Sequence, residues 1–297
     1  MSNDPVINSA LFRFCQLADD GPRTAPTEPR NLADLQWLRE ALEAVEAPEK
    51  IVQKLLLTIG KDDTSNEDFI CAVEELSDMV EDMNWALEFV LMGGHVIILR
   101  LLESSQRAKQ SAEVRKHLAL VVAHASQQND KVQKAFNDAK WADVIVPLTR
   151  SEEDQGALAA FLHACSCMCR ECDEGSAAFL ASKGLEVLQK LLSPQCSDKI
   201  NDKIANRVLF LVAYFSRIGV SSSDLIESTC MYVVSPASST ETSIAATNVV
   251  NQVLIKSPAL LTTVRKIVLP YLEGLEGLAK DDPRSTLRKM LTGDANR

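Results

Sequence analysis

Apolar side chains recur three and four residues apart along most of the chain from Asn31 onward. This spacing predicts amphipathic helices. One apolar stripe closes at Pro48, and a second covers residues 51–59. Longer stripes predict single long helices over residues 69–92, 114–137 and 155–181. The first of these ends at Gly93-Gly94, where a left-handed glycine would stop the helix. The pattern predicts an all-α protein.

The segments that come directly after the three predicted long helices show that the chain contains a sequence repeat. The segments resemble one another when Gly94, Lys140 and Gly184 are aligned, which gives offsets of 46 and 44 residues. A period in the forties with two or three helices in each unit is typical of armadillo and HEAT repeats. We therefore expect an all-α, armadillo/HEAT-like right-handed helical solenoid.

The chain divides into three expected parts. Residues 1–30 form an N-terminal arm, in which apolar residues at helical spacing predict one short helix: Ile7, Leu11, Phe14 and Cys15. Three prolines in residues 21–31 predict a flexible linker. Residues 31–219 form the repeat domain, and residues 220–297 are expected to be a divergent C-terminal helical cap of the same solenoid.

Composition and charge narrow the possible partners. Only 11 glycines and 11 prolines among 297 residues indicate a helix-rich chain. No apolar run is long enough to span a membrane and the first residues lack the features of a signal peptide, so we expect a cytoplasmic protein (cytosol, possibly nucleus). The net charge of −10 disfavours nucleic acid and favours a partner with basic groups.

An acidic segment lies near the start of the repeats. Between Asp62 and Arg100 there are ten carboxylates and no Lys or Arg. On the predicted helix they include one face made of Glu74, Asp78, Glu81 and Asp82. Such a face is either simply solvated or docks a basic surface, and like charges four residues apart slightly destabilise a helix.

The cysteines and histidines offer little catalytic chemistry. The segment Cys165–Cys172 contains four cysteines, three of which share a helical face; core packing explains them better than a metal or redox site, because no second closely spaced pair exists. The four histidines are too scattered for zinc, although His124 and His163 are expected at similar places in successive repeats. No hydrolase, zinc-protease or phosphate-loop motif occurs. We expect a non-enzymatic protein without cofactor or metal.

Several segments, in order, resemble the Fes / heat-shock-protein-binding family of armadillo-type nucleotide exchange factors for 70-kDa heat-shock chaperones. They are residues 31–42, 75–89, 126–129 and 179–188. The resemblance covers about residues 31–216, and the chain departs from the family at Pro147, which is expected to break a helix, at the cysteine cluster and in the last eighty residues. It implies a monomeric co-chaperone whose concave face binds the chaperone's nucleotide-binding domain and opens the ADP cleft. It also implies that the N-terminal arm aids substrate release.

The resemblance also assigns partner-binding residues. It implies that Arg207 faces the chaperone and that Ala86 permits close approach of the partner. Alignment of residues 122–126 with residues 212–216 places His117 at the point equivalent to Arg207 two repeats earlier, so both are expected to look into the groove. The alternative for Arg207 is a helix cap or a pair with Asp202. The full candidate set also includes acidic and amide residues: Asp78, Glu81, Asp82, Asn84 and Asn129.

A second interpretation is an armadillo-type adaptor that binds an extended peptide or another protein partner. Peptide-binding armadillo proteins line their groove with regularly spaced Trp and Asn. Here Trp37, Trp85 and Trp141 do not recur at equivalent positions, and only Asn84 and Asn129 are expected to correspond.

Overall fold

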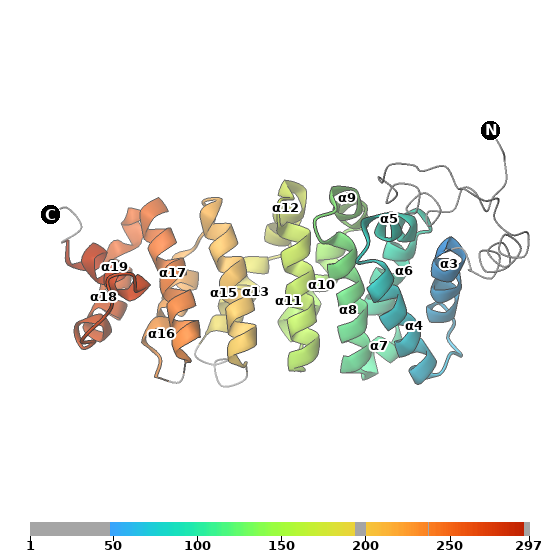
Figure 1. The fold of residues 1–297 in the computed structure, drawn as a ribbon, viewed down its shortest axis with the longest axis horizontal. Coiled ribbons are helices and arrows are strands. Elements are labelled where there is room, and N and C mark those ends of the chain that lie inside the picture. Colours follow the sequence, from blue (N-terminus) through green and yellow to red (C-terminus); the bar gives the residue numbers. More distant parts are fainter. Residues whose placement is uncertain (1–47, 194–199, 237, 294–297) are drawn as a thin grey trace, which may run out of the picture.

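The computed structural model describes residues 48–193, 200–236 and 238–293, which form a single row of stacked helices (Figure 1). These residues contain no β-strand. Two sequence-based expectations, the N-terminal arm (1–30) and the helix over residues 32–45, lie outside the described residues. The helices are α3 (Pro48–Ile59), α4 (Asn66–Met79), α5 (Met83–Leu91), α6 (Gly94–Ser104), α7 (Gln106–Gln110), α8 (Ala112–Ser126), α9 (Asp130–Asp138), α10 (Trp141–Ser151), α11 (Gln155–Cys169), α12 (Asp173–Ala181), α13 (Gly184–Leu192), α15 (Asp202–Arg217), α16 (Ser223–Val234), α17 (Thr240–Lys256), η1 (Pro258–Leu260), α18 (Leu261–Glu273) and α19 (Pro283–Thr292).

Three consecutive units repeat one order: a nine-residue helix, a middle helix and a long helix. They are α5–α6–α8, α9–α10–α11 and α12–α13–α15. The short helices begin after Asp82, Asn129 and Cys172, so the true offsets are 47 and 43 residues. The expected alignment on Lys140 was one residue off, since Trp141 is the residue equivalent to Gly94 and Gly184.

The prediction of three very long helices was wrong. Each apolar stripe continues through a break of three residues, where a new helix begins: α4 is followed by α5, α8 by α9, and α11 by α12. The side chain before each short helix caps it, because Asp82, Asn129 and Cys172 accept hydrogen bonds from backbone N–H groups of the first turn. Spacing alone did not reveal the breaks because apolar residues continue at helical spacing across them. In α5 the residues at that spacing include Met83, which is exposed, whereas the buried residues are Ala86 and Phe89.

The turn after each short helix is left-handed, as the glycine pattern predicted for Gly93 (φ 76°). Lys140 and Lys183 hold the same conformation in the next two units. The following glycine is needed for a different reason. A Cβ on Gly94 would lie 2.3 Å from the ring of Phe89, and one on Gly184 would lie 2.2 Å from Phe179. These buried rings therefore pack directly on the backbone of the next helix.

Pro147 does not break its helix. Helix α10 runs from Trp141 to Ser151 through this residue, so the predicted interruption was wrong. The proline removes one backbone N–H donor. Burial of Trp141, Ile145 and Val146 in the core stabilises the helix on both sides of the proline.

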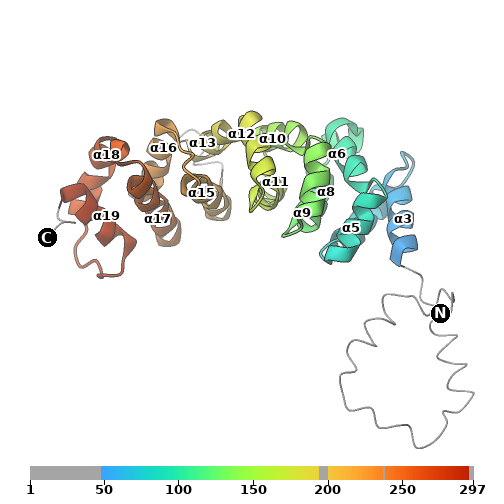
Figure 2. The ribbon, with the colours of Figure 1, turned by 90° about the horizontal axis from the view of Figure 1, so that it is seen from above.

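The units stack into a curved, two-layered array (Figure 2). The long helices α4, α8, α11, α15 and α17 pack side by side and form the concave face, which is turned towards the viewer in Figure 1. The helices α6, α10, α13, α16 and α18 form the convex layer. The core between the layers is continuous from Val52 to Leu291. Within the described ranges no single helix could cross a membrane; only α5 and α6 taken together, with a 74° bend between them, pass by length and composition.

Candidate protein-binding surface

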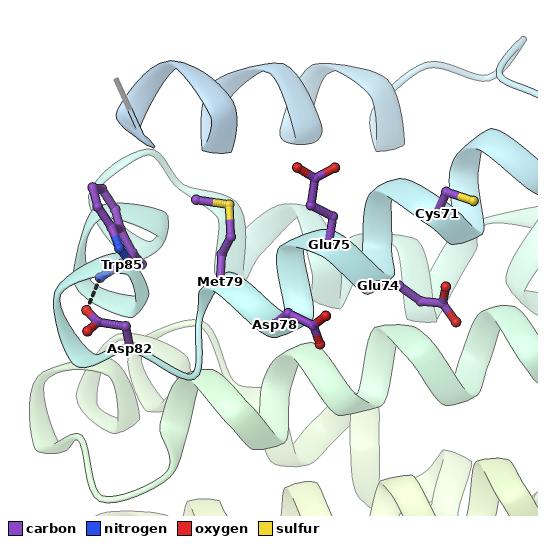
Figure 3. Close-up of a pocket in the computed structure, with 7 residues that line it drawn as sticks. All are labelled: Cys71, Glu74, Glu75, Asp78, Met79, Asp82 and Trp85. Atoms are coloured by element: carbon purple, nitrogen blue, oxygen red, sulfur yellow. Dashed lines mark hydrogen bonds between the residues drawn. The ribbon is translucent and has the colours of Figure 1, made fainter. Parts of the chain in front are cut away.

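The concave face has an acidic end formed by α4 and the break that follows it. Glu74, Glu75 and Asp78 are exposed on α4 and line an open hollow together with Met79 and Trp85 (Figure 3). Figure 3 shows Glu74 and Asp78 turned towards α8, whereas Glu75 and Cys71 point towards α3. This hollow is a shallow surface feature and not an enclosed pocket.

The predicted acidic face is only partly continuous. Glu81 and Asp82 are exposed, but they lie beyond the end of α4 at Met79 and do not extend its helical face. Asp82 is held by its capping role, because its carboxylate accepts hydrogen bonds from the N–H groups of Asn84 (2.8 Å) and Trp85 (3.3 Å). Glu81 instead reaches α8, where its Oε1 lies 3.3 Å from Nδ1 of His124.

His117 is buried and does not look into the groove, contrary to the prediction. Its Nε2 lies 3.3 Å from Oε1 of Glu74, too poorly aligned for a hydrogen bond. Burial and the neighbouring Lys116 lower the pKa of His117, although Glu74 opposes the change. His117 is therefore neutral at neutral pH and packs between α8 and α4 without a hydrogen bond to Glu74.

His124 and His163 meet across adjacent helices but are not equivalent, which corrects a second expectation. The residue equivalent to His124 is Cys167, 43 positions later. The two histidine rings contact edge to face with centroids 5.9 Å apart. Burial, followed by the charges of Arg207 and His124, lowers the pKa of His163 to about 4. His163, on α11 between α8 and α15, is therefore uncharged at neutral pH.

Arg207 lies half-buried on α15, at the floor of the concave face. Its Nη1 donates a 2.7 Å hydrogen bond to the backbone oxygen of Ala159 on α11. The structure shows this bond and no pair with Asp202. Arg207 thus ties two concave helices together, and its contact with a partner remains a prediction.

The remaining candidates differ in exposure. Asn84 is exposed on α5, but Ala86 is only 1% exposed and packs in the core. The expected correspondence of Asn84 with Asn129 is wrong, because Asn129 is equivalent to Asp82 and caps α9. Asn129 is also buried. Neither Ala86 nor Asn129 presents its side chain to a partner in this conformation.

Sequence reasoning missed an aromatic and a basic residue that lie together on the concave face. Phe210 of α15 is 42% exposed, and the guanidinium of Arg170, at the end of α11, lies 5.3 Å from the centre of its ring. Exposed aromatic and arginine side chains are the residue types that dominate protein interfaces. The available signal was a phenylalanine on the otherwise polar stripe of α15, which includes Lys203, Asn206 and Arg217.

The cysteines within α11 are packed in the core as predicted, but Cys172 does not share their helical face, because α11 ends at Cys169. Cys165, Cys167 and Cys169 are buried in α11, and Cys172 caps α12. Burial raises the pKa of Cys165 to about 12 and that of Cys167 to about 11. Within the described ranges no three His, Cys, Asp or Glu side chains are grouped as metal ligands. The absence of metal in the protein itself remains a prediction.

We expect the buried thiols to be unreactive in the native protein. The thiolate is the nucleophile, so a raised pKa and burial both slow alkylation. Iodoacetamide at pH 8 should modify exposed Cys71 at least about tenfold faster than Cys165 or Cys169, as followed by peptide mass spectrometry. Equal rates in the folded protein would show that α11 is not packed as described.

Comparison with solved structures identifies the fold, whereas no family model and no curated protein matches the chain. Among solved structures, the designed armadillo repeat protein YIII(Dq)4CqI is 15% identical with a TM-score of 0.61, over 82% of this chain and 98% of that one. A second design, YIII(Dq.V1)4CPAF in complex with peptide (KR)4, is 16% identical with a TM-score of 0.60 over the same shares. A third, computationally designed for modular peptide recognition, is 16% identical with a TM-score of 0.62. The described part of this chain therefore has the armadillo-repeat fold.

Proposed function

We propose that the chain is a protein-binding scaffold whose concave face binds a folded partner, the nucleotide-binding domain of a 70-kDa heat-shock chaperone. The observation that carries the proposal of a folded partner is the exposed Phe210–Arg170 pair on a surface that also holds an acidic end. The choice of chaperone rests on the resemblance of four segments between residues 31 and 188. No family model or curated match adds to it.

The proposed activity is release of ADP from the chaperone. A scaffold that binds the open arrangement of the chaperone lobes more tightly than the closed one lowers ADP affinity by the same factor. Such an activity needs an extended rigid surface and no catalytic side chain. The continuous core from α3 to α19 provides the rigidity, and residues 1–30 would aid substrate release.

The alternative function is binding of an extended basic peptide. The acidic residues of α4 favour it, and a designed armadillo protein of similar fold was solved with the peptide (KR)4. The groove composition favours a folded partner instead. Within the described ranges the two tryptophans lie on α5 and α10, and Trp141 is buried, so neither forms a ladder along the concave helices.

The test uses the full chain and a fluorescent ADP analogue bound to a purified 70-kDa chaperone. Phe210→Ser should lower the acceleration of ADP release at least about tenfold, because a central interface aromatic is worth about 2 kcal/mol or more. Met231→Ser is the matched control, since Met231 is 41% exposed on α16 in the convex layer. Both variants should unfold within about 2 °C of the parent.

Two results would redirect the proposal. No acceleration by the parent protein would exclude the exchange function. If a (Lys-Arg)4 peptide then bound tightly and Asp78→Asn with Glu75→Gln weakened it, the adaptor function would take its place.

A further inference from the structure

The outer face of α5 carries large apolar side chains, whereas the equivalent faces of the next two repeats carry charged residues or alanine. Met83, Leu87 and Leu91 lie four residues apart, on one side of the helix, and Met83 and Leu91 are 59% and 70% exposed. At the equivalent positions α9 carries Asp130, Lys134 and Asp138, and α12 carries Asp173, Ala177 and Ala181. The three helices have the same length and are capped at equivalent positions. The apolar stripe is therefore a property of the α5 sequence and not of the place of α5 in the repeat.

Nothing in the packing of the stack requires this stripe. The inward face of each short helix is alike in the three repeats, because a buried phenylalanine occupies the same position in each: Phe89, Phe136 and Phe179. The Lys134–Asp138 ion pair on α9 shows that a charged outer face suits the same helix geometry. An exposed apolar stripe of this kind marks a contact.

We propose that this stripe, Met83–Leu87–Leu91, is the docking site for the chain's own N-terminal segment, residues 5–18. That segment has apolar residues at matching helical spacing: Ile7, Leu11, Phe14 and Cys15. Helix α3 begins at Pro48 and packs against α5, so the chain enters α3 beside α5 (Figure 3). The thirty residues from 18 to 47 are long enough to reach it, and a tether of this kind gives an effective concentration of about a millimolar.

The charge of the two segments favours residues 5–18 over residues 31–46, which lie closer to α3 in the sequence. Glu81 and Asp82 directly precede α5 and Glu88 lies within it, and no Lys or Arg occurs in the sequence between Asp62 and Arg100. Residues 31–46 contain four carboxylates and only Arg39, so they would meet like charge. Residues 5–18 contain Arg13 and no carboxylate. Docking of residues 5–18 on α5 would bury the apolar stripe and bring Arg13 towards the acidic residues of this region.

The experiment places the photoreactive residue benzoylphenylalanine at Phe14 in the full-length chain and maps the cross-links by mass spectrometry. Most intramolecular adducts should fall on α5. The double substitution Met83→Asp/Leu91→Asp, which copies the acidic residues of α9, should reduce those adducts at least about fivefold. It should also speed tryptic cleavage after Arg13 by a similar factor. The matched control is Ala181→Asp, at the position of α12 equivalent to Leu91, and it should change neither quantity.

Three results would overturn the proposal. They are adducts spread over the surface without preference for α5, adducts confined to a second copy of the chain, and adducts on α5 that persist unchanged in the double variant. A circular dichroism melt of each variant checks that loss of adducts does not come from unfolding. The outcome is independent of chaperone binding, since no chaperone is present.

Discussion

Replacing Arg115 with Met should lower the free energy of unfolding by about 3–5 kcal/mol at pH 7, because it leaves a buried carboxylate without its partner. Arg115 on α8 binds Glu152, between α10 and α11, through two hydrogen bonds: Nε to Oε2 (2.6 Å) and Nη2 to Oε1 (2.8 Å). The side chain of Glu152 is 4% exposed. The same carboxylate accepts the N–H groups of Glu153 and Asp154, so it holds the connection between two repeats.

The decrease in the free energy of unfolding caused by Arg115→Met should depend on pH in a definite direction. Burial alone would raise the pKa of Glu152, but the hydrogen bonds from Arg115 and from the backbone of Asp154 and Glu153 bring it below its ordinary value. The pair therefore stabilises the parent protein above about pH 4.3, the ordinary value, and this stabilisation is lost as pH falls through the folded pKa. In Arg115→Met, Glu152 stays buried but loses the hydrogen bonds from Arg115, so we expect its pKa to rise and the stability deficit of the variant to grow as pH rises.

Urea unfolding at pH 7 and pH 4 measures the effect. The deficit of Arg115→Met relative to the parent should be largest at pH 7 and smaller at pH 4, where Glu152 becomes protonated in the variant. Adding Glu152→Gln to Arg115→Met should recover part of the loss at pH 7, because no charge is then buried. A deficit under about 1 kcal/mol that does not change with pH would mean that Glu152 is solvated in the native state.

The repeat could be predicted from sequence because its buried positions are the ones that periodicity detects. Phe89, Phe136 and Phe179 recur with the turn that follows them, and this turn set the period to within one residue. The breaks between long and short helices could not be predicted from the stripe alone. They depend on single capping side chains, and Cys172 in this role is not a residue type that usually marks a helix start.

The site was harder to predict because sequence does not separate a residue that faces the groove from one that joins two helices. Arg207 and His117 lie at equivalent positions, yet Arg207 bonds to a backbone oxygen and His117 is buried against Glu74. Both contacts cross from one repeat to the next. Among the acidic candidates Asp78 is exposed on the face of α4 as predicted, whereas Glu81 lies in the break after α4 and reaches His124.

Substituting Ala86 with Arg should destabilise the fold by about 3 kcal/mol or more, through overpacking and burial of an unpaired charge. The resemblance assigned this alanine to the partner surface, where a larger side chain would only exclude the partner. In the structure Ala86 is 1% exposed on the inward side of α5, three residues before the buried Phe89.

The equivalent positions in the next repeats supply the control for Ala86→Arg. They are also buried, but Gln133 donates to the backbone oxygen of Cys167 (2.8 Å) and Ser176 to that of Cys169 (3.0 Å). Ala86→Ser, which copies Ser176, adds one small hydroxyl that can bond to the preceding turn, so it should cost under about 1 kcal/mol. Thermal melts followed by circular dichroism compare the two. If Ala86→Arg melted with the parent and failed only in chaperone binding, Ala86 would be accessible in solution and α5 would have to move away from the core to expose it.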